Sequence, residues 1–217
     1  MQPFEATTPR PLGPRPALAP DAAVRLLSAA RAQAAILVEG WSDQAALEAL
    51  ARRRGLDLRG EGIVVVPIGG ATNVHRFVQV LGPHGLRMRL AGLCDVAELG
   101  HVRRGLQRGG VAANADRPMD PAHHGFYACD ADLEDELIRA LGAPAVERVL
   151  DAEGELASFR RFQDQPAQRG RELHAQLHRF LGTRAGRKVR YGALLVDALD
   201  LVRVPKALDL ALHRARR

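Results

Sequence analysis

Cysteine is scarce in this sequence of 217 residues, with only Cys94 and Cys129. Both fall in predicted strands without a close-spaced partner, so we expect small core residues and neither a disulfide framework nor a four-cysteine zinc site. Long apolar runs are also missing. No stretch approaches the roughly 20 apolar residues that cross a bilayer, and the proline-rich N-terminus is unlike a secretory signal. We therefore expect a cytoplasmic protein with no membrane partner.

Lysine is nearly absent as well, because Lys188 and Lys206 are the only two among 31 lysines and arginines. A coding bias toward arginine would replace lysine throughout, so a lysine that persists hints at a need for an ammonium group. The net charge is +6, and the isoelectric point is near 10.3. These values are compatible with a polyanionic partner but do not identify one.

Apolar strand patterns alternate with amphipathic helix patterns in the first part of the chain. Strands are expected at residues 35–38, 62–68, 87–94 and 125–129, and helices at about 21–33, 42–55, 74–81 and 96–106. Such alternation predicts right-handed crossovers and an α/β, Rossmann-like fold, in which helices cover both faces of a mainly parallel four-stranded sheet. Ser42 is the predicted cap of the second helix, and Thr72 or Asn73 the cap of the third.

Composition divides the chain into three parts. Residues 1–20 contain repeated prolines and are expected to form a disordered arm. Residues 21–154 hold the alternating pattern and form the predicted sheet domain. Residues 155–217 carry only helical patterns and are expected to pack on that domain as a helical appendage.

Acidic residues recur where the predicted strands end. They are, in chain order, Glu39, Asp43, Asp95, Asp130, Asp132 and Glu134. The carboxyl ends of parallel strands meet at one edge of a sheet, and acids gathered there repel one another unless a cation neutralises them. Carboxylate oxygens suit Mg²⁺ or Mn²⁺, and magnesium is usually held by one or two carboxylates, water and substrate phosphates. The pattern therefore indicates phosphate chemistry.

Some of these residues also have a purely structural interpretation. Helix starts collect acids for capping and for the helix dipole, which favours a structural role for Asp130 and allows Asp132 to be a cap, whereas Glu134 is favoured as functional. The pair Gly69-Gly70 after the second strand is either a turn or a site where a phosphate approaches the amides of the next helix.

Four motifs follow one another along residues 34–212. They are Val38-Glu39-Gly40 with Ser42-Asp43, a later strand that ends at Asp95, the acidic stretch from Ala131 to Leu137, and the stretch from Gly186 to Tyr191, which contains Lys188. This ordered set resembles the TOPRIM domain, in the version found in the OLD (overcoming lysogenization defect) nucleases. The resemblance implies a TOPRIM α/β fold and a metal-dependent endonuclease that hydrolyses DNA phosphodiester bonds.

The resemblance also implies a role for each matching residue. Glu39 would be a metal ligand or general base, Asp43 and Asp95 metal ligands, and Glu134 a second-site ligand, with Asp132 beside it in the metal set. Lys188 would stabilise the charged transition state or leaving group. These roles suit an in-line phosphoryl displacement, in which metal ions neutralise the attacking and leaving oxygens and a lysine adds charge where charge develops.

Two departures from the family pattern leave alternatives open. The family's DxD element has a second aspartate where this chain has Ala97, followed by Glu98. Either Glu98 reaches the metal from the first helical turn, or a metal position is lost and the protein is a degenerate module that binds nucleic acid or a partner without cutting. OLD proteins also carry an ATPase domain, whereas this sequence has no G-x-x-x-x-G-K-[ST] loop. An ATPase, if one is needed, would be a separate subunit, and a homodimer is the other expected assembly.

Arginines form three clusters in the sequence. They are Arg52, Arg53 and Arg54; Arg103, Arg104 and Arg108; and Arg184, Arg187 and Arg190. Each cluster can simply be a solvated face. The last one surrounds Lys188 and precedes a helix, so it is the cluster that we expect to contact a nucleic-acid backbone. An ordinary nucleotide-binding protein is the weakest alternative, because the G-x-G-x-x-G element is absent.

Overall fold

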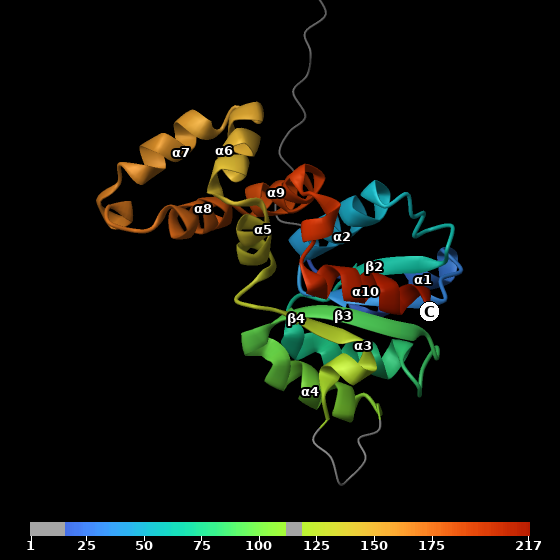
Figure 1. Ribbon diagram of the computed structural model, residues 1–217. Coiled ribbons are helices and arrows are strands. Elements are labelled where there is room, and N and C mark those ends of the chain that lie inside the picture. The colour runs from blue at the N-terminus through green and yellow to red at the C-terminus, as the bar shows by residue number, and fades with distance from the viewer. Residues whose placement is uncertain (1–15, 112–118) are drawn as a thin grey trace, which may run out of the picture.

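The structure is a computed structural model that describes residues 16–111 and 119–217. Its centre is a sheet of four parallel strands in the order β2-β1-β3-β4 (Figure 1). The strands are β1 (Ala34–Val38), β2 (Ile63–Pro67), β3 (Arg89–Asp95) and β4 (Phe126–Cys129). The chain moves from β1 to one side and later returns to the other, so the carboxyl ends of β1 and β3 form the switch point where ligands of such sheets bind.

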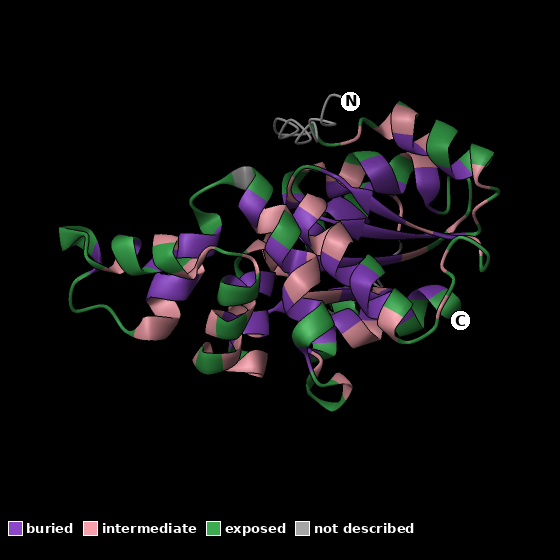
Figure 2. Ribbon diagram, turned by 90° about the horizontal axis from the view of Figure 1, so that it is seen from above, coloured by how far each residue is buried: buried purple, intermediate pink, exposed green. Residues whose placement is uncertain are grey.

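Helices cover both faces of this sheet, which confirms the predicted α/β fold. All five residues of β1 are buried, as expected for a strand between two helical layers. One layer contains α1 (Pro20–Ala29), α3 (Val74–Leu81) and α4 (Leu99–Arg108). The other contains α2 (Trp41–Arg53), α9 (Ala185–Ala198) and α10 (Lys206–Arg216). Figure 2 shows the buried residues along the strands and the inner sides of these helices.

Alternate residues of β1 belong to different layers. Ile36 packs in the core under α2, whereas Leu37 packs in the core under α3 and α4. This alternation follows from the two-residue period of a strand. Both predicted strand cysteines are buried and free, as core residues. No helix among residues 16–111 and 119–217 is long and apolar enough to span a membrane.

The helical patterns after β4 divide between two places. Helices α5 (Leu133–Leu141), α6 (Ala143–Ala152), α7 (Leu156–Gln163) and α8 (Leu173–Gly182) project from the sheet to the left in Figure 1. We call α5–α8 the helical arm. The rings of Phe159 and Phe180 in this arm lie 5.2 Å apart, and both belong to the same hydrophobic core as α2, α9 and α10. Helices α9 and α10 return to the sheet, α9 beside α2 and α10 beside β3 and β4.

Two local predictions need correction. Ser42 is not the cap of α2, because Gly40 is the N-cap and Ser42 lies buried in the first turn. The proline-rich segment is ordered at its end, since the Leu18 amide donates to the Pro67 carbonyl at 3.2 Å. Residues 1–15 of that segment lie outside the described residues. Asn73 does occupy the cap position of α3, although its side chain makes no capping hydrogen bond.

Candidate metal centre

Glu39 and Asp95 lie side by side at the switch point. Glu39 directly follows β1, and Asp95 is the last residue of the neighbouring strand β3. The Asp95 amide donates to Glu39 Oε1 at 3.2 Å. The structure therefore brings together two acids that are far apart in the sequence, at the edge where the strand pattern predicted a site.

The backbone of Glu39 is fixed by the glycine pair after β2. The amides of Gly69 and Gly70 both donate to the Glu39 carbonyl, at 2.9 and 3.2 Å. Their φ angles of +75° and +103° lie in the region that glycine tolerates best. Both of these amides are therefore already engaged by the protein backbone, and the predicted approach of a phosphate to the amides of the next helix stays a prediction. The pair holds the turn that presents Glu39.

Asp43 lies in the first turn of α2 on the same edge. Its Oδ2 accepts a hydrogen bond from the Gly40 amide at 2.7 Å, which closes the turn between β1 and α2. Burial raises the pKa of Asp43 to about 7, and the negative charge of Glu134 adds to this rise. Its structural role as a capping residue therefore coexists with a raised pKa, although the charge of Lys188 opposes part of the rise.

Burial also raises the pKa of Asp95 to about 7, with further contributions from the charges of Glu39 and Asp132. The pKa of Glu39 is raised by burial and by Glu98, although the Asp95 hydrogen bond opposes the rise. We call Glu39, Asp43 and Asp95 the edge carboxylates. Within residues 16–111 and 119–217, none of the three forms an ion pair.

Lys188 reaches this edge from α9. Its Nζ lies 3.0 Å from Glu134 Oε2, and the Glu134 side chain on the first turn of α5 is only 4% exposed. The other oxygen of Glu134 is buried without a hydrogen-bond partner. Burial by itself would lower the pKa of Lys188, but Glu134, Asp132 and Asp43 outweigh that effect and raise it. The ammonium therefore stays protonated.

Close packing between α9 and α2 sets the position of Lys188. A Cβ atom added to Gly192 would lie 2.6 Å from the carbonyl oxygen of Ser42, closer than real Cβ contacts allow. Gly192 therefore permits the backbones of the two helices to touch. The contact is next to Asp43 in α2 and one turn beyond Lys188 in α9.

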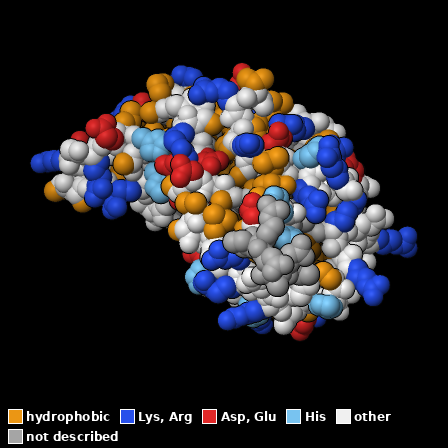
Figure 3. All heavy atoms as spheres, turned by 60° about the horizontal axis from the view of Figure 1, so that its bottom comes forward, with side chains coloured by type: hydrophobic (Ala, Val, Ile, Leu, Met, Phe, Trp, Pro, Cys, Tyr) orange, Lys and Arg blue, Asp and Glu red, His pale blue; other side chains and the backbone are white. Residues whose placement is uncertain are grey.

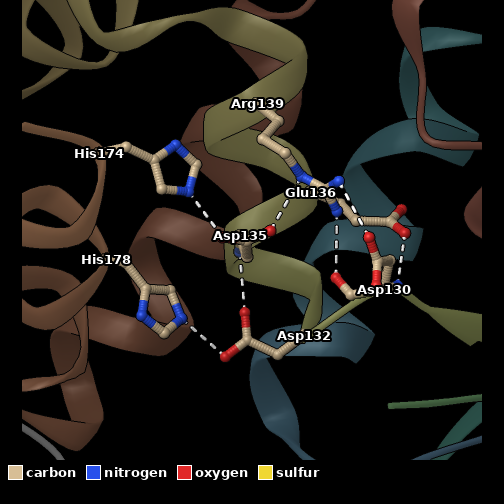
Figure 4. A network of polar contacts seen from close by, with 7 residues as sticks. All are labelled: Asp130, Asp132, Asp135, Glu136, Arg139, His174 and His178. Carbon is tan, nitrogen blue, oxygen red and sulfur yellow. Dashed lines mark hydrogen bonds and ion pairs between the residues drawn. The ribbon is translucent and has the colours of Figure 1, made fainter. Parts of the chain in front are cut away.

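Asp132, a predicted metal ligand, is held by two partners. Its Oδ1 caps α5 by accepting from the Asp135 amide at 2.8 Å, and its Oδ2 lies 2.7 Å from His178 Nε2 (Figure 4). Burial raises its pKa, but the His178 hydrogen bond and the capping contact reverse this effect, and the net pKa is lowered. The structural interpretation of Asp132 as a cap is confirmed, and the residue is not an open ligand in this arrangement.

The acids beside Asp132 are paired in the same way. Asp135 lies 2.6 Å from His174 Nε2 and 2.9 Å from Arg139 Nε, and Arg139 also lies 3.2 Å from Asp130 (Figure 4). We call Asp130, Asp132 and Asp135 the arm carboxylates. Sequence reasoning missed His174 and His178, although their spacing of four residues places them on one side of α8.

Glu98 lies in the 3₁₀ turn η2 (Val96–Glu98) that follows Asp95. Its charge contributes to the raised pKa of Glu39, so it belongs to the same edge. Ala97, which stands where the family pattern has an aspartate, is exposed beside it. The structure thus places an acid close to the missing position.

The predicted nucleic-acid cluster on α9 is only partly available. Arg187 is buried, forms an ion pair with Glu155 at 2.6 Å and lies over the Phe180 ring. This burial and pairing do not favour the predicted contact of Arg187 with nucleic acid, which stays a prediction. Arg190 is half exposed, but it is paired with Glu153 at 3.5 Å and with Glu155. Arg184 is exposed at the N-cap of the helix.

The donor set fits a divalent cation that keeps part of its water shell. Among the described residues, no three His, Cys, Asp or Glu side chains form a complete ligand group. Magnesium requires only one or two protein carboxylates, because water and substrate phosphates supply its other ligands. The hydrogen-bonded Glu39 and Asp95, with no cationic partner and with raised pKa values, meet this requirement. Their all-oxygen chemistry favours Mg²⁺ or Mn²⁺.

Comparisons with known proteins agree with this geometry. Residues 32–96 match the family model described as overcoming lysogenization defect protein-like, TOPRIM domain. Two structures of the C-terminal region of the Xanthomonas campestris pv. campestris OLD protein are similar. The one phased with iodine has a TM-score of 0.62, with 25% identity over 85% of this chain and 94% of that chain. The one phased with platinum has a TM-score of 0.63, with 25% identity over 86% and 93%.

The C-terminal region of the Burkholderia pseudomallei OLD protein has the same fold, with a TM-score of 0.61 and 24% identity over 85% of this chain and 97% of that chain. No curated protein matches the sequence. The resemblance inferred from the sequence motifs is thereby confirmed.

Proposed function

We propose that this protein is a nuclease, which hydrolyses DNA phosphodiester bonds with the aid of Mg²⁺ or Mn²⁺. Its residues 32–96 match the OLD-like TOPRIM domain. The observation that carries the proposal is the pair Glu39 and Asp95, joined by a hydrogen bond of 3.2 Å at the switch point and without a cationic partner among the described residues. Acids in this state gain from a proton or a cation, and phosphate esters bring oxygen ligands that complete the shell of a cation.

Hydrolysis forms a bond between a water oxygen and phosphorus and breaks the bond from phosphorus to one ester oxygen. A bound divalent cation would lower the pKa of the water and neutralise the phosphoryl charge. Glu39 is the proposed acceptor of the water proton, because burial raises its pKa toward the neutral range in which a base acts best. Asp95 and Asp43 are the proposed carboxylates that hold the cation, and Glu98 supports them from η2.

Lys188 is the proposed stabiliser of negative charge on the leaving oxygen. Its pKa is raised, and its side chain is 42% exposed, so a protonated ammonium can reach a substrate. Glu134 holds this ammonium in position from α5. A preorganised positive charge contributes most where the transition state is more negative than the ground state.

Cleavage of supercoiled plasmid DNA in Mg²⁺ or Mn²⁺ tests the proposal. Glu39→Ala is expected to abolish cleavage, and Glu48→Ala is the matched control, because Glu48 is an exposed glutamate on the neighbouring helix α2. Equal cleavage by the wild type and Glu39→Ala would contradict the assigned site.

A second candidate is a TOPRIM module that binds nucleic acid or a partner without cutting. The exposed Ala97 at the position of the missing aspartate favours it. Calorimetric titration with Mn²⁺ separates the two functions: binding that is lost in Asp95→Asn supports a working centre, whereas no binding by the wild type supports the second candidate.

The partners that we propose are DNA, a separate ATPase subunit and a second copy of the chain. The ATPase proposal rests on the OLD resemblance, which implies an ATPase as a partner. Light scattering of the purified protein, alone and after co-expression with a candidate ATPase, measures both assemblies.

A further inference from the structure

The layer formed by α3 and α4 carries positive charge and no acid. The sequences of both helices contain no aspartate or glutamate. Their exposed arginines are Arg76, Arg103, Arg104 and Arg108. We call these four residues the basic face. Figure 3 turns this side toward the viewer and shows Lys and Arg side chains spread over its lower part.

The two helices form one continuous surface. A Cβ atom at Gly105 of α4 would lie 2.9 Å from the Val74 side chain of α3, so the helices touch at this point. Both cover the same face of the sheet, and their exposed sides therefore point the same way. The charges of the basic face therefore lie on the same side of the sheet.

The arginines of the basic face have no acidic partner within 4 Å among residues 16–111 and 119–217. Ion pairs in these ranges engage other arginines, which are Arg52, Arg54, Arg139, Arg160, Arg187, Arg190 and Arg216. Arg104 lies within hydrogen-bond distance of His101 Nδ1, at 3.3 Å. Glutamates neutralise Arg187 and Arg190 of the α9 cluster, whereas the cluster on α4 has no such partners among the described residues.

The position of α4 links this charge to the metal centre. The helix begins at Leu99, immediately after the turn that contains Glu98, and ends at Arg108. Its ten residues span about 15 Å at 1.5 Å per residue. One DNA strand has a phosphate about every 3.4 Å along the axis, so this length matches about four successive phosphates.

A cavity of about 330 Å³ lies at the far end of α4. Arg89, Arg214 and His124 line it together with Leu106 of α4, and no aspartate or glutamate belongs to its lining. A recess whose lining contains no acid therefore lies beyond the far end of α4, at the amino end of β3. This second observation is independent of the helix sequences.

We infer that the basic face is the docking surface for the backbone of duplex DNA and that it leads the duplex to the edge carboxylates. The inference rests on the proposed function. Arginine binds phosphate through paired N–H donors, and such contacts position a protein without reading sequence. A protein partner fits less well, because protein interfaces have an apolar centre. In the described ranges, the exposed large hydrophobic side chains lie outside α3 and α4.

Anisotropy of a labelled DNA duplex, titrated with the full chain in EDTA at several salt concentrations, tests the inference without cleavage. The variant is Arg103→Gln, Arg104→Gln and Arg108→Gln combined. The matched control combines Arg161→Gln, Arg169→Gln and Arg179→Gln, three exposed arginines of the arm without an ion pair in the described residues. Circular dichroism confirms that both variants fold.

The basic-face variant is expected to bind the duplex at least about tenfold more weakly, and its salt slope to fall by about 3, because each phosphate contact contributes about 1. The control is expected to retain wild-type binding. Equal loss in both variants, no loss in either, or no duplex binding by the wild type would overturn the inference. The inference would also be overturned if the basic-face variant lost more affinity for polyglutamate than for the DNA duplex. That result would identify an acidic protein as the partner.

The Glu39→Ala variant separates this inference from the proposed function. It is expected to bind the duplex as the wild type does. If the protein binds the duplex through the basic face but never cuts DNA, the nuclease assignment is contradicted and the docking surface is not. Metal-dependent cutting that is lost in Glu39→Ala but unchanged in the basic-face variant contradicts the docking surface alone.

Discussion

Two groups of acids lie close together in this molecule and differ in how their charge is compensated. The arm carboxylates are paired, with His178 at 2.7 Å from Asp132 and His174 at 2.6 Å from Asp135. The edge carboxylates have no ion pair among the described residues, and burial raises the pKa of Asp43 and Asp95 to about 7. The position of an acid in the sequence does not show to which group it belongs, because the acids of both groups follow the ends of strands.

The difference indicates which acids are structural and which need an external cation. A carboxylate with a histidine or arginine partner already has its charge balanced, and its pKa is lowered, as in Asp132. A half-buried carboxylate that has acidic neighbours and no ion-pair partner is destabilised until it gains a proton or an ion. Asp132 and Asp135 therefore fasten α8 to α5, Asp130 is paired with Arg139 of α5, and the edge carboxylates form the proposed centre.

The largest expected difference between the groups is in DNA cleavage. Asp95→Asn is expected to lower the rate by about 10²–10³-fold, the loss typical of one electrostatic group in an active site. Asp135→Asn is expected to change it less than about tenfold, because Asp135 acts only through α8. A plasmid-nicking time course in Mg²⁺ measures both rates. Similar losses in the two variants would remove the distinction.

Divalent cation is expected to stabilise the fold through the edge carboxylates, and more strongly at pH 8 than at pH 5.5. The folded pKa of about 7 for Asp43 and Asp95 exceeds the ordinary value of 3.8. Between these values the folded state binds more protons than the unfolded state, so these groups lower the stability as the pH rises. A cation must displace those protons below pH 7.

Thermal melts with and without Mg²⁺ at both pH values measure this effect. Ligand at about 100 times its dissociation constant contributes about 2.7 kcal/mol, which is at least about 5 °C for a chain of this size. Asp95→Asn should lose the gain at pH 8. An equal gain at both pH values would contradict the assignment of these two pKa values.

Lys188→Met is expected to lower the free energy of unfolding by about 1–3 kcal/mol, because it leaves the Glu134 carboxylate buried without a partner. Because the lysine side chain is partly exposed, this loss of stability is expected to be smaller than the loss caused by breaking a fully buried ion pair. Lys206→Met, at the exposed start of α10, is the matched control and should stay within about 0.5 kcal/mol. Urea unfolding measures both. Equal stability of the two variants would show that Glu134 does not depend on Lys188.

The smallest expected effect is that of His178→Ala, about 1 kcal/mol at pH 6. The folded pKa of His178 is raised above 6.5, chiefly by the hydrogen bond with Asp132. Its contribution is complete below pH 6.5 and is lost as the pH rises through the folded pKa. The cost of the substitution should therefore shrink by pH 9. His123→Ala, at a 77% exposed side chain, is the control in urea unfolding. A cost that grows with pH would contradict the pairing.

The strands and most helices could be predicted because their signals are local. Ile36 and Leu37 lie in a continuous apolar run, and such a run between turn residues predicts a buried strand. The edge position of Glu39 and Asp95 followed from the rule that parallel strands share their carboxyl ends. Lys188 was found through family resemblance and through the rarity of lysine, not through its spacing.

The missed features depend on partners distant in sequence. The sequence around Arg187 does not predict that Glu155 and Phe180 bury it. The sequence around Gly69 does not predict that its amide donates to the Glu39 carbonyl. The pairing of Asp132 with His178 likewise joins two helices. Sequence patterns locate charges on elements, whereas the balance among charges depends on how those elements pack.

The contact between Gly192 and Ser42 determines at what stage of translation the proposed centre can form. A nascent chain that stops before α9 contains the edge carboxylates but neither Lys188 nor the packing that positions it. Domains generally fold as units while the ribosome is still elongating the chain. The complete centre therefore assembles only when α9 docks on α2. We expect that the nascent chain does not cleave DNA until its C-terminal helices have folded.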